Sequence, residues 1–386
     1  MDRIYKIGGH CFALPDERLM EAVDGISGFK PFVWQPDLVS VKDVYEGAWL
    51  PDFTVWEGNG WGFPAFQRKS YGFGYEDVTG TFGVSGDSFL LELAPQGEPS
   101  LYLRTMGGTG RGICLYGNYS PRLLRFALWM GYGLMTVRKD TVALHGSCIV
   151  YKGKAVLFLG ESGTGKSTHT RLWRENIAGS KLLNDDSPIV RYEEGCVWVY
   201  GSPWSGKTPC YKAECYPLAG CVRLSQAPYN KIRRLNTLQA YAALHPSAPP
   251  AFAYEEELYC GVCSLLEKMV SSIPVYHLEC LPDAEAVKLV CRTLYGDGYE
   301  ANECFFAWVE SEIKSGRSVK FRVKGNSMMP LLRNGKDEVV VGPYDKEELK
   351  LFDVILFRQT DRYVLHRIIQ KRGSRYLMQG DGVCRF

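Results

Sequence analysis

The sequence predicts a multidomain protein of mixed α/β and β class, and three observations point to this class. First, 386 residues are long for one domain, because roughly 150 residues per domain suggests two or three. Second, the expected elements change in kind along the chain, from short strands to alternating strands and helices and back to strands. Third, 46% hydrophobic and 23% charged residues are typical of an ordered protein with large cores.

Three domains are expected. Residues 1–118 are rich in Gly and aromatic residues, and alternating runs such as SFLLEL and SLYLRT predict a β-rich N-terminal domain. Residues 119–300 open on a helix with Ser120 at the cap and Pro in the first turn, then alternate strands with helices, which predicts an α/β core. After the run YGDGYEANE, residues 301–386 predict an amphipathic helix followed by an all-β domain.

Composition and charge indicate the class of protein and its cellular location. No run approaches the about 18 apolar residues of a membrane helix, and the first residues lack a basic then apolar leader. The 13 cysteines are scattered, several of them inside apolar runs, which favours buried free thiols and a cytoplasmic protein without a membrane span. From residue 311 onward, 16 Lys and Arg face 9 Asp and Glu, against 29 and 34 before it. We interpret this basic tail as a separate domain surface rather than a nucleic-acid site.

The stretch VLFLGESGTGKSTHTRLW matches the phosphate-binding pattern Gly-x4-Gly-Lys-Ser/Thr, between an expected strand and an expected helix. Glycines let backbone N–H groups surround phosphates, and the helix N-terminus favours an anion. Lys166 can reach the β- and γ-phosphates, and the Ser167 hydroxyl can bind Mg²⁺. We therefore expect ATP and Mg²⁺ as cofactors, with nucleotide-binding residues Gly160, Ser162, Gly163, Thr164, Gly165, Lys166, Ser167 and Thr168.

Two adjacent carboxylates, Asp185 and Asp186, end the strand-like run SKLLNDD. Carboxylates at a strand end can hold Mg²⁺ and can take a proton from an attacking hydroxyl. We expect both to be catalytic, with Asp185 beside Ser167 as a metal ligand. His145 lies one expected hairpin before the loop, where a lone His is more often structural.

The run from His145 to Asp186 resembles the kinase domain of HPr kinase/phosphorylase, a family related to ATP-dependent phosphoenolpyruvate carboxykinase. The shared order is a His-Gly pair, a β-hairpin, a Gly-x-Ser-Gly-x-Gly-Lys-Ser loop, a helix, and a strand ending in Asp-Asp. The resemblance implies phosphorylation of a serine hydroxyl on a protein. It also implies that one of Asp185 and Asp186 is the general base while the other aids the metal, and that His145 is catalytic and lies near the phosphates.

The chain departs from this family after residue 186. The later acidic ligand and the glycine-rich signature of the family are not visible, and VYGSPWSGKTPCYKAECYPLAG stands instead. This segment resembles stand-alone kinase homologues found beside peptide-modification genes. That resemblance implies that Ser202, Trp204, Ser205 and Lys207 border the active site, and the alternative is a surface turn.

A second set of motifs lies in the tail: KGNSMMP, LFDVILF, YVLHRII and MQGDG. Their order resembles the type I signal peptidase and LexA-like serine protease superfamily, which implies Ser327 as nucleophile, His366 as general base and Asp381 as the group that orients His366. The alternative is a peptide-binding or vestigial domain. The chain stops five residues after Asp381, so we expect a truncated domain.

The preferred function is therefore an ATP- and Mg²⁺-dependent kinase that phosphorylates a Ser or Thr hydroxyl on a peptide or small protein. Its appended serine peptidase-like domain would bind or cleave a peptide. The alternatives are a non-catalytic ATP-sensing regulator with a peptide-binding tail, and a small-molecule kinase. A homo-oligomer is compatible with the sequence. The Cys260-x-x-Cys263 pair is better explained by packing than by metal binding, because no second cysteine pair stands at the spacing of a zinc site.

Overall fold

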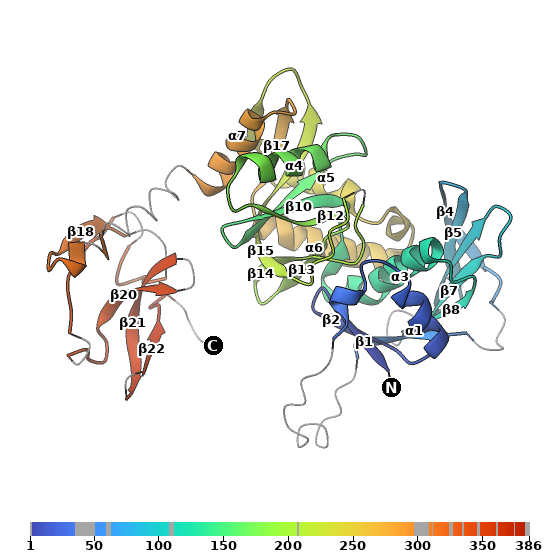
Figure 1. Ribbon diagram of the computed structural model, residues 1–386, viewed down its shortest axis with the longest axis horizontal. Coiled ribbons are helices and arrows are strands. Elements are labelled where there is room, and N and C mark those ends of the chain that lie inside the picture. Colours follow the sequence, from blue (N-terminus) through green and yellow to red (C-terminus); the bar gives the residue numbers. More distant parts are fainter. Residues whose placement is uncertain are drawn as a thin grey trace. The chain divides into compact units, whose positions relative to one another are not determined.

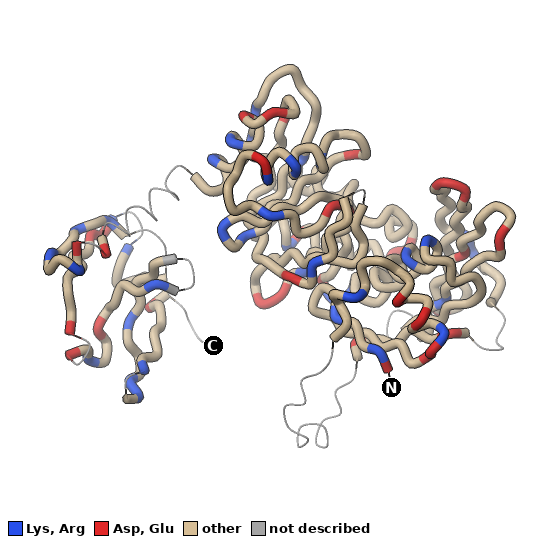
Figure 2. Tube along the Cα trace, in the orientation of Figure 1, with Lys and Arg blue, Asp and Glu red and all other residues tan. Residues whose placement is uncertain are grey.

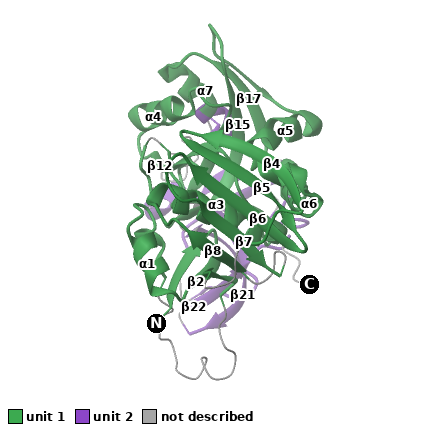
Figure 3. Ribbon diagram, turned by 90° about the vertical axis from the view of Figure 1, so that its right-hand side faces the viewer, with its two compact units in different colours: residues 1–290 green, residues 291–386 purple. Residues whose placement is uncertain are grey.

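The computed structural model describes residues 2–34, 51–58, 63–107, 112–206, 208–296, 309–310, 312–323, 327–333, 336–345, 348–359, 362–373 and 375–382. These fall into two compact units, Met1–Val290 and Cys291–Phe386 (Figure 3). The protein is a mixed α/β structure with several β-sheets, as the sequence predicts. None of the described helices combines the length and apolarity needed to span a membrane.

Unit 1 begins with an eight-stranded sheet in the order β1-β2-β3-β8-β7-β6-β5-β4 (Figure 1). Alternation in the strands directs Leu91, Leu93, Leu101 and Leu103 into the core, where each is fully buried. The strands are β1 Arg3–Ile7, β2 His10–Leu14, β3 Phe53–Glu57, β4 Arg68–Tyr75, β5 Val78–Ser85, β6 Ser88–Pro95, β7 Leu101–Met106 and β8 Gly112–Gly117.

A second sheet of nine strands carries the phosphate-binding motif, and its main path is β12-β10-β11-β15-β14-β13-β9, with β17 beside β15 and β16 beside β17. The β10–β11 hairpin is apolar on both faces, as expected of central strands. The strands are β9 Thr141–Ala143, β10 Gly146–Tyr151, β11 Lys154–Leu159, β12 Lys181–Asp186, β13 Ile189–Glu193, β14 Cys196–Tyr200, β15 Cys215–Gln226, β16 Lys231–Arg234 and β17 Val275–Cys280.

The helices of unit 1 cover and connect these sheets. Each described α-helix buries apolar side chains, α3 on nearly every side of its second half, and short 3₁₀ turns complete the connections. They are α1 Glu17–Asp24, α3 Pro121–Thr136, α4 Lys166–Asn176, α5 Thr237–Leu244, α6 Glu256–Ser272, η1 Lys30–Phe32, η2 Val137–Lys139, η3 His245–Ser247 and η4 Pro250–Tyr254; α7, Ala284–Tyr295, extends past the unit boundary.

Helix α3 joins the two sheets into one core. It begins at Pro121, as the sequence predicts, and packs against β7 of the first sheet and β9 of the second. Its fully buried Tyr132 donates a hydrogen bond to the Ile7 carbonyl of β1 at 3.0 Å. The expected boundary at residue 118 therefore lies between two sheets that share one compact unit.

A buried polar cluster also ties the first sheet to the second. The His10 ring on β2 lies 3.3 Å from Asp52 through Nδ1 and 2.9 Å from the Thr141 hydroxyl of β9 through Nε2. Asp52 further accepts from Lys139 Nζ at 2.7 Å and from the Cys11 amide at 2.9 Å. Burial opposes ionisation of Asp52, but these hydrogen bonds outweigh it and hold the pKa of its carboxyl well below the usual range.

Replacing Asp52 by Ala is expected to destabilise unit 1 by about 1–3 kcal/mol, because three donors lose a partly buried acceptor. Since folding lowers this pKa, the contribution is fully present above the unfolded value of about 4 and is lost as pH falls below it. Urea denaturation at pH 7 and pH 3 measures both effects. Asp24→Ala, which removes an exposed pair with Arg3, is the matched control; equal losses for the two variants would contradict the account.

The described residues of unit 2 include two small sheets. One pairs β18 Val319–Arg322 with β19 Glu338–Val341, and the other has the order β20 Val354–Gln359, β21 Arg362–Arg372 and β22 Arg375–Gln379. Basic residues recur along this unit, and acidic residues lie near several of them (Figure 2). Four of the basic side chains form ion pairs of 2.6–2.8 Å: Arg317–Glu312, Lys320–Glu338, Arg333–Asp337 and Arg367–Asp381.

Candidate active site

The phosphate-binding motif forms a loop between β11 and α4. Gly160, Gly163 and Gly165 have φ angles of 151°, 83° and 98°, a backbone region that side chains other than glycine rarely adopt. A Cβ atom at Gly160 would also lie 2.6 Å from the Thr164 hydroxyl. The pattern of glycines therefore reflects the backbone path of the loop, and α4 begins directly after it at Lys166.

Lys166 is folded back onto its own loop. Its Nζ donates to the carbonyls of Gly160 at 2.7 Å and Glu161 at 3.0 Å. Burial lowers the pKa of this ammonium group, while the nearby carboxylates of Asp186 and Asp185 oppose that shift. Within the described part of the chain, Lys166 Nζ donates only to these loop carbonyls, so the ammonium group can turn to a phosphate without loss of a core contact.

Asp185 lies at the end of β12 and is only 5% exposed. Its Oδ1 accepts from Ser167 of α4 at 3.0 Å and from Ser147 of β10 at 2.8 Å, while its Oδ2 is buried without a hydrogen-bond partner among the described residues. An unpartnered buried carboxylate oxygen is costly, and a bound cation would satisfy it. Asp185 Oδ2 and the Ser167 hydroxyl thus fit a Mg²⁺ ion, which uses few protein ligands and takes the rest from phosphate and water.

The described residues hold no cluster of three or more His, Cys, Asp or Glu side chains that could bind a metal by themselves. A Mg²⁺ ion bound by Asp185 and Ser167 would therefore need a nucleotide and water for its other ligands. Ser147 was not anticipated as part of this site. The strand register pairs Ser147 with Asp185, and only knowledge of the β10–β12 pairing would have placed the two side chains together.

Asp186 has a different environment from its neighbour. Its carboxylate is 40% exposed, and Oδ1 lies 3.4 Å from Nδ1 of His145. His145 precedes β10, whose first residue, Gly146, pairs with Asp186, and the His145 amide donates to the Ser247 carbonyl at 2.7 Å. The structure therefore brings His145, Asp185 and Asp186 to one sheet edge, with Asp185 turned toward the loop helix and Asp186 toward solvent.

The segment after β14 is fixed against this edge. Ser202 is fully buried, and Trp204 is 4% exposed. The Asn184 amide donates to Ser202 and to the Trp204 carbonyl, and its oxygen accepts from the Asp186 amide at 3.1 Å. Ser205 forms an isolated bridge with Asp186. These three predicted residues thus border the site rather than forming a free surface turn, and Lys207 lies outside the described residues.

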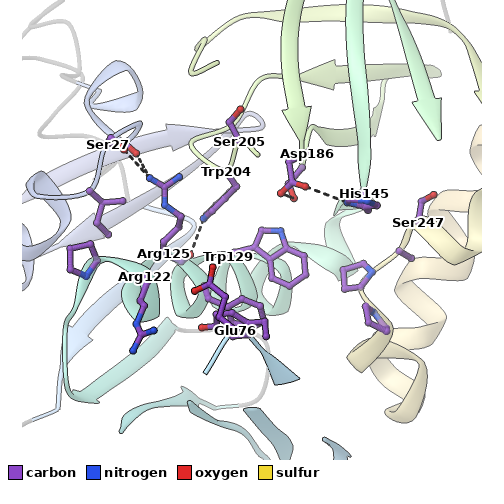
Figure 4. A pocket seen from close by; sticks show the side chains of 18 of the residues that line it. Ser27, Glu76, Arg122, Arg125, Trp129, His145, Asp186, Trp204, Ser205 and Ser247 are labelled. Carbon is purple, nitrogen blue, oxygen red and sulfur yellow. Dashed lines mark hydrogen bonds and ion pairs between the residues drawn. The ribbon is translucent and has the colours of Figure 1, made fainter. Parts of the chain in front are cut away.

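A pocket of about 850 Å³ opens beside Asp186 and His145 (Figure 4). Aromatic rings and prolines line much of it, including Trp129 of α3 and Trp204. Figure 4 shows His145 and Asp186 pointing toward each other on one side, with Trp129 and Arg125 of α3 across from them. Part of the wall comes from the first sheet and from the turn after α1, a contribution that local sequence patterns did not reveal.

In unit 2 the second set of predicted residues is only partly assembled. The Ser327 carbonyl accepts from the Gly382 amide at 2.8 Å, which places this residue near the end of β22. Both oxygens of Asp381 accept from the Arg367 guanidinium, at 2.8 and 2.7 Å, and among the described residues no hydrogen bond joins Asp381 to His366. The paired, charge-assisted hydrogen bonds fix the Asp381 carboxylate against Arg367. Across the described residues, no hydrogen bond joins Ser327 to His366.

No protein-family model matches this chain, and no curated protein matches it. Among solved structures, the HPr(Ser) kinase/phosphatase from Coxiella burnetii is a weak neighbour. It has a TM-score of 0.24 and 13% identity, and the match covers 44% of this chain and 97% of that chain. A likeness this weak assigns neither a fold nor a function to the chain.

Proposed function

We propose that unit 1 is a kinase that transfers the γ-phosphoryl group of ATP to a Ser or Thr hydroxyl of a peptide or small protein. The observation that carries this proposal is the difference in environment between two adjacent carboxylates. Asp185 is buried against the Ser167 hydroxyl of the phosphate-binding loop, whereas Asp186 lines the open pocket next to His145.

The residues of the loop would hold the donor. Mg·ATP supplies the phosphoryl group, and its metal neutralises charge during transfer. Ser167 and Asp185 Oδ2 would bind Mg²⁺, and Lys166 would leave the loop carbonyls for the phosphates. The positive N-terminus of α4 adds to this anion site.

Asp186 would accept the proton of the acceptor hydroxyl. It is exposed to the pocket, and its fixed backbone position comes from Asn184, which binds its amide. His145 lies close enough to hold the Asp186 carboxylate in place and to share the transferred proton. This arrangement supports Asp186 as the general base and, as the sequence analysis expected, Asp185 as the metal ligand.

The lining of the pocket supports a peptide acceptor. Its volume of about 850 Å³ lies within the range of small-ligand pockets, about 300–1,000 Å³, and also has room for side chains of a peptide. Its walls carry aromatic and proline side chains suited to apolar residues that flank the reacting hydroxyl. We propose no catalytic role for unit 2, because the Asp381 carboxylate forms an ion pair with Arg367.

The test is incubation of the full chain with Mg²⁺ and γ-labelled ATP in two parallel arms. One arm contains a mixed-sequence peptide library with Ser or Thr, and the other contains small hydroxyl compounds. We expect label on Ser or Thr of peptides. Label confined to the second arm would identify a small-molecule kinase, and no transfer in either arm would favour the non-catalytic regulator.

Filling the pocket should separate acceptor binding from ATP binding. Ala248 lines the pocket from an extended backbone position after η3, so Ala248→Trp is compatible with the fold. We expect the variant to lower kcat/KM for the peptide by about tenfold or more, the effect of losing about 1.4 kcal/mol of binding, with an unchanged Kd for ATP. Ala248→Ser is the control, and full activity of the Trp variant would place the acceptor elsewhere.

A further inference from the structure

A second cavity lies beside the phosphate-binding loop. Its volume is about 640 Å³, and its lining combines loop residues Gly163 and Thr164, His169 of α4, and residues that end or follow β15 and β17. The apolar part of the wall includes Leu224, Ala227 and Leu281. It shares no lining residue with the pocket beside Asp186, so the two cavities are separate.

His169 is the unusual member of this wall. Its side chain is only 3% exposed, and Nε2 is buried without a hydrogen-bond partner among the described residues. The ring is held edge-on to Phe158 of β11, with ring centroids 4.7 Å apart. A buried polar atom without a partner is unfavourable unless a ligand or water satisfies it. A polar group that enters this cavity can therefore form a hydrogen bond with the imidazole.

The shape and chemistry of the cavity suit a flat aromatic ring with polar edges. Its apolar wall can cover the faces of such a ring, and an imidazole nitrogen can donate or accept a hydrogen bond according to its tautomer. The cavity is also continuous with the loop, because the Gln226 amide donates to the Gly163 carbonyl at 3.2 Å along its edge. A ligand whose phosphates occupy the loop can thus place its other end here.

We propose that this cavity is the nucleobase subsite of the phosphoryl donor, and that His169 Nε2 makes a hydrogen bond to the edge of the base. The inference rests on the proposed function, since it requires the loop to bind phosphates. It goes further in assigning a role to His169, which phosphate binding does not require. The base would then lie in a cavity separate from the acceptor pocket beside Asp186.

The test compares the affinities of ATP and inorganic tripolyphosphate by calorimetry, in Mg²⁺ and without any acceptor. Ala227→Trp occupies part of the cavity, and His169→Phe keeps a planar aromatic ring, somewhat larger than imidazole, but removes both nitrogens. Because a neutral hydrogen bond contributes about 0.5–1.5 kcal/mol, we expect His169→Phe to weaken ATP binding about two- to tenfold. Tripolyphosphate binding should not change in either variant. His277→Gln, on β17 and outside the lining, is the matched control.

The possible results separate the two proposals. Tighter binding of ATP than of tripolyphosphate, with the difference reduced in both variants, supports the subsite. Equal affinities in the wild-type protein overturn the subsite while leaving the phosphate-binding loop intact. Binding of neither compound overturns the nucleotide site and the subsite together. If His169→Phe does not fold, judged by circular dichroism, Ala227→Trp alone decides, and an unchanged ATP affinity in that variant overturns the inference.

Discussion

Replacing Asp186 by Asn is expected to lower the rate of phosphoryl transfer by about 10²–10⁴-fold, the usual contribution of a general base. The carboxylate is exposed to the acceptor pocket, and among the described residues it forms no hydrogen bond with α4, whereas Asp185 accepts a hydrogen bond from Ser167. An amide cannot accept the hydroxyl proton, but it keeps the shape of the side chain. The Kd for Mg·ATP should therefore stay near the wild-type value while kcat falls.

The neighbouring variant should behave differently. Asp185→Asn removes charge from the buried oxygen that fits Mg²⁺, so we expect the Mg²⁺ concentration needed for half-maximal rate to rise. Asp87→Asn, on the turn between β5 and β6, is the control for a lost surface charge. Rates and Mg²⁺ requirements measured across the three variants decide the assignment. A raised Mg²⁺ requirement in Asp186→Asn with normal kcat would reverse the two roles.

The second large effect is expected from Lys166→Ala. Among the described residues, Lys166 donates hydrogen bonds only to carbonyls of its own loop, so its removal should leave the thermal stability of unit 1 unchanged. Loss of a charged group that stabilises the transferred phosphate typically costs about 10²–10³-fold in rate, and binding of ATP should weaken as well. Calorimetry with Mg·ATP and a single-turnover assay measure the two effects.

A matched lysine provides the control for this variant. Lys181 begins β12 and pairs with Glu214 at 2.7 Å, and it is not part of the loop. Lys181→Ala should therefore keep normal ATP affinity. If Lys166→Ala folds normally and binds ATP as tightly as the wild-type protein, the loop does not bind phosphate and the kinase proposal does not hold.

The parts of the site that are local in sequence could be predicted from the sequence. The glycine spacing predicts the loop because each glycine adopts a positive φ, and the run ending in Asp185 and Asp186 predicts the end of β12. The start of α3 at Pro121 also follows from its local signals. In each case, backbone geometry or capping within a few residues decides the structure.

The parts that depend on distant pairing could not be predicted in this way. His10 forms a hydrogen bond with Thr141, 131 positions later in the sequence, and the N-terminal sheet and the second sheet belong to one unit. The local sequence of neither segment indicates this contact. Asn184 anchors Ser202 only because β12 and the loop after β14 meet. In unit 2, the order of the motifs did not predict that Asp381 would pair with Arg367. Tertiary contacts determine each of these partners, and local patterns do not encode them.

The most direct test of the central claim is a crystal structure of the full chain with Mg²⁺ and a non-hydrolysable ATP analogue. The account predicts that the triphosphate lies in the loop from Gly160 to Ser167, with the metal bound to the Ser167 hydroxyl and to Asp185 Oδ2. Asp186 should remain free of the metal and face the pocket. A triphosphate bound away from this loop, or an Asp185 Oδ2 that still has no partner when the nucleotide is bound, would contradict it.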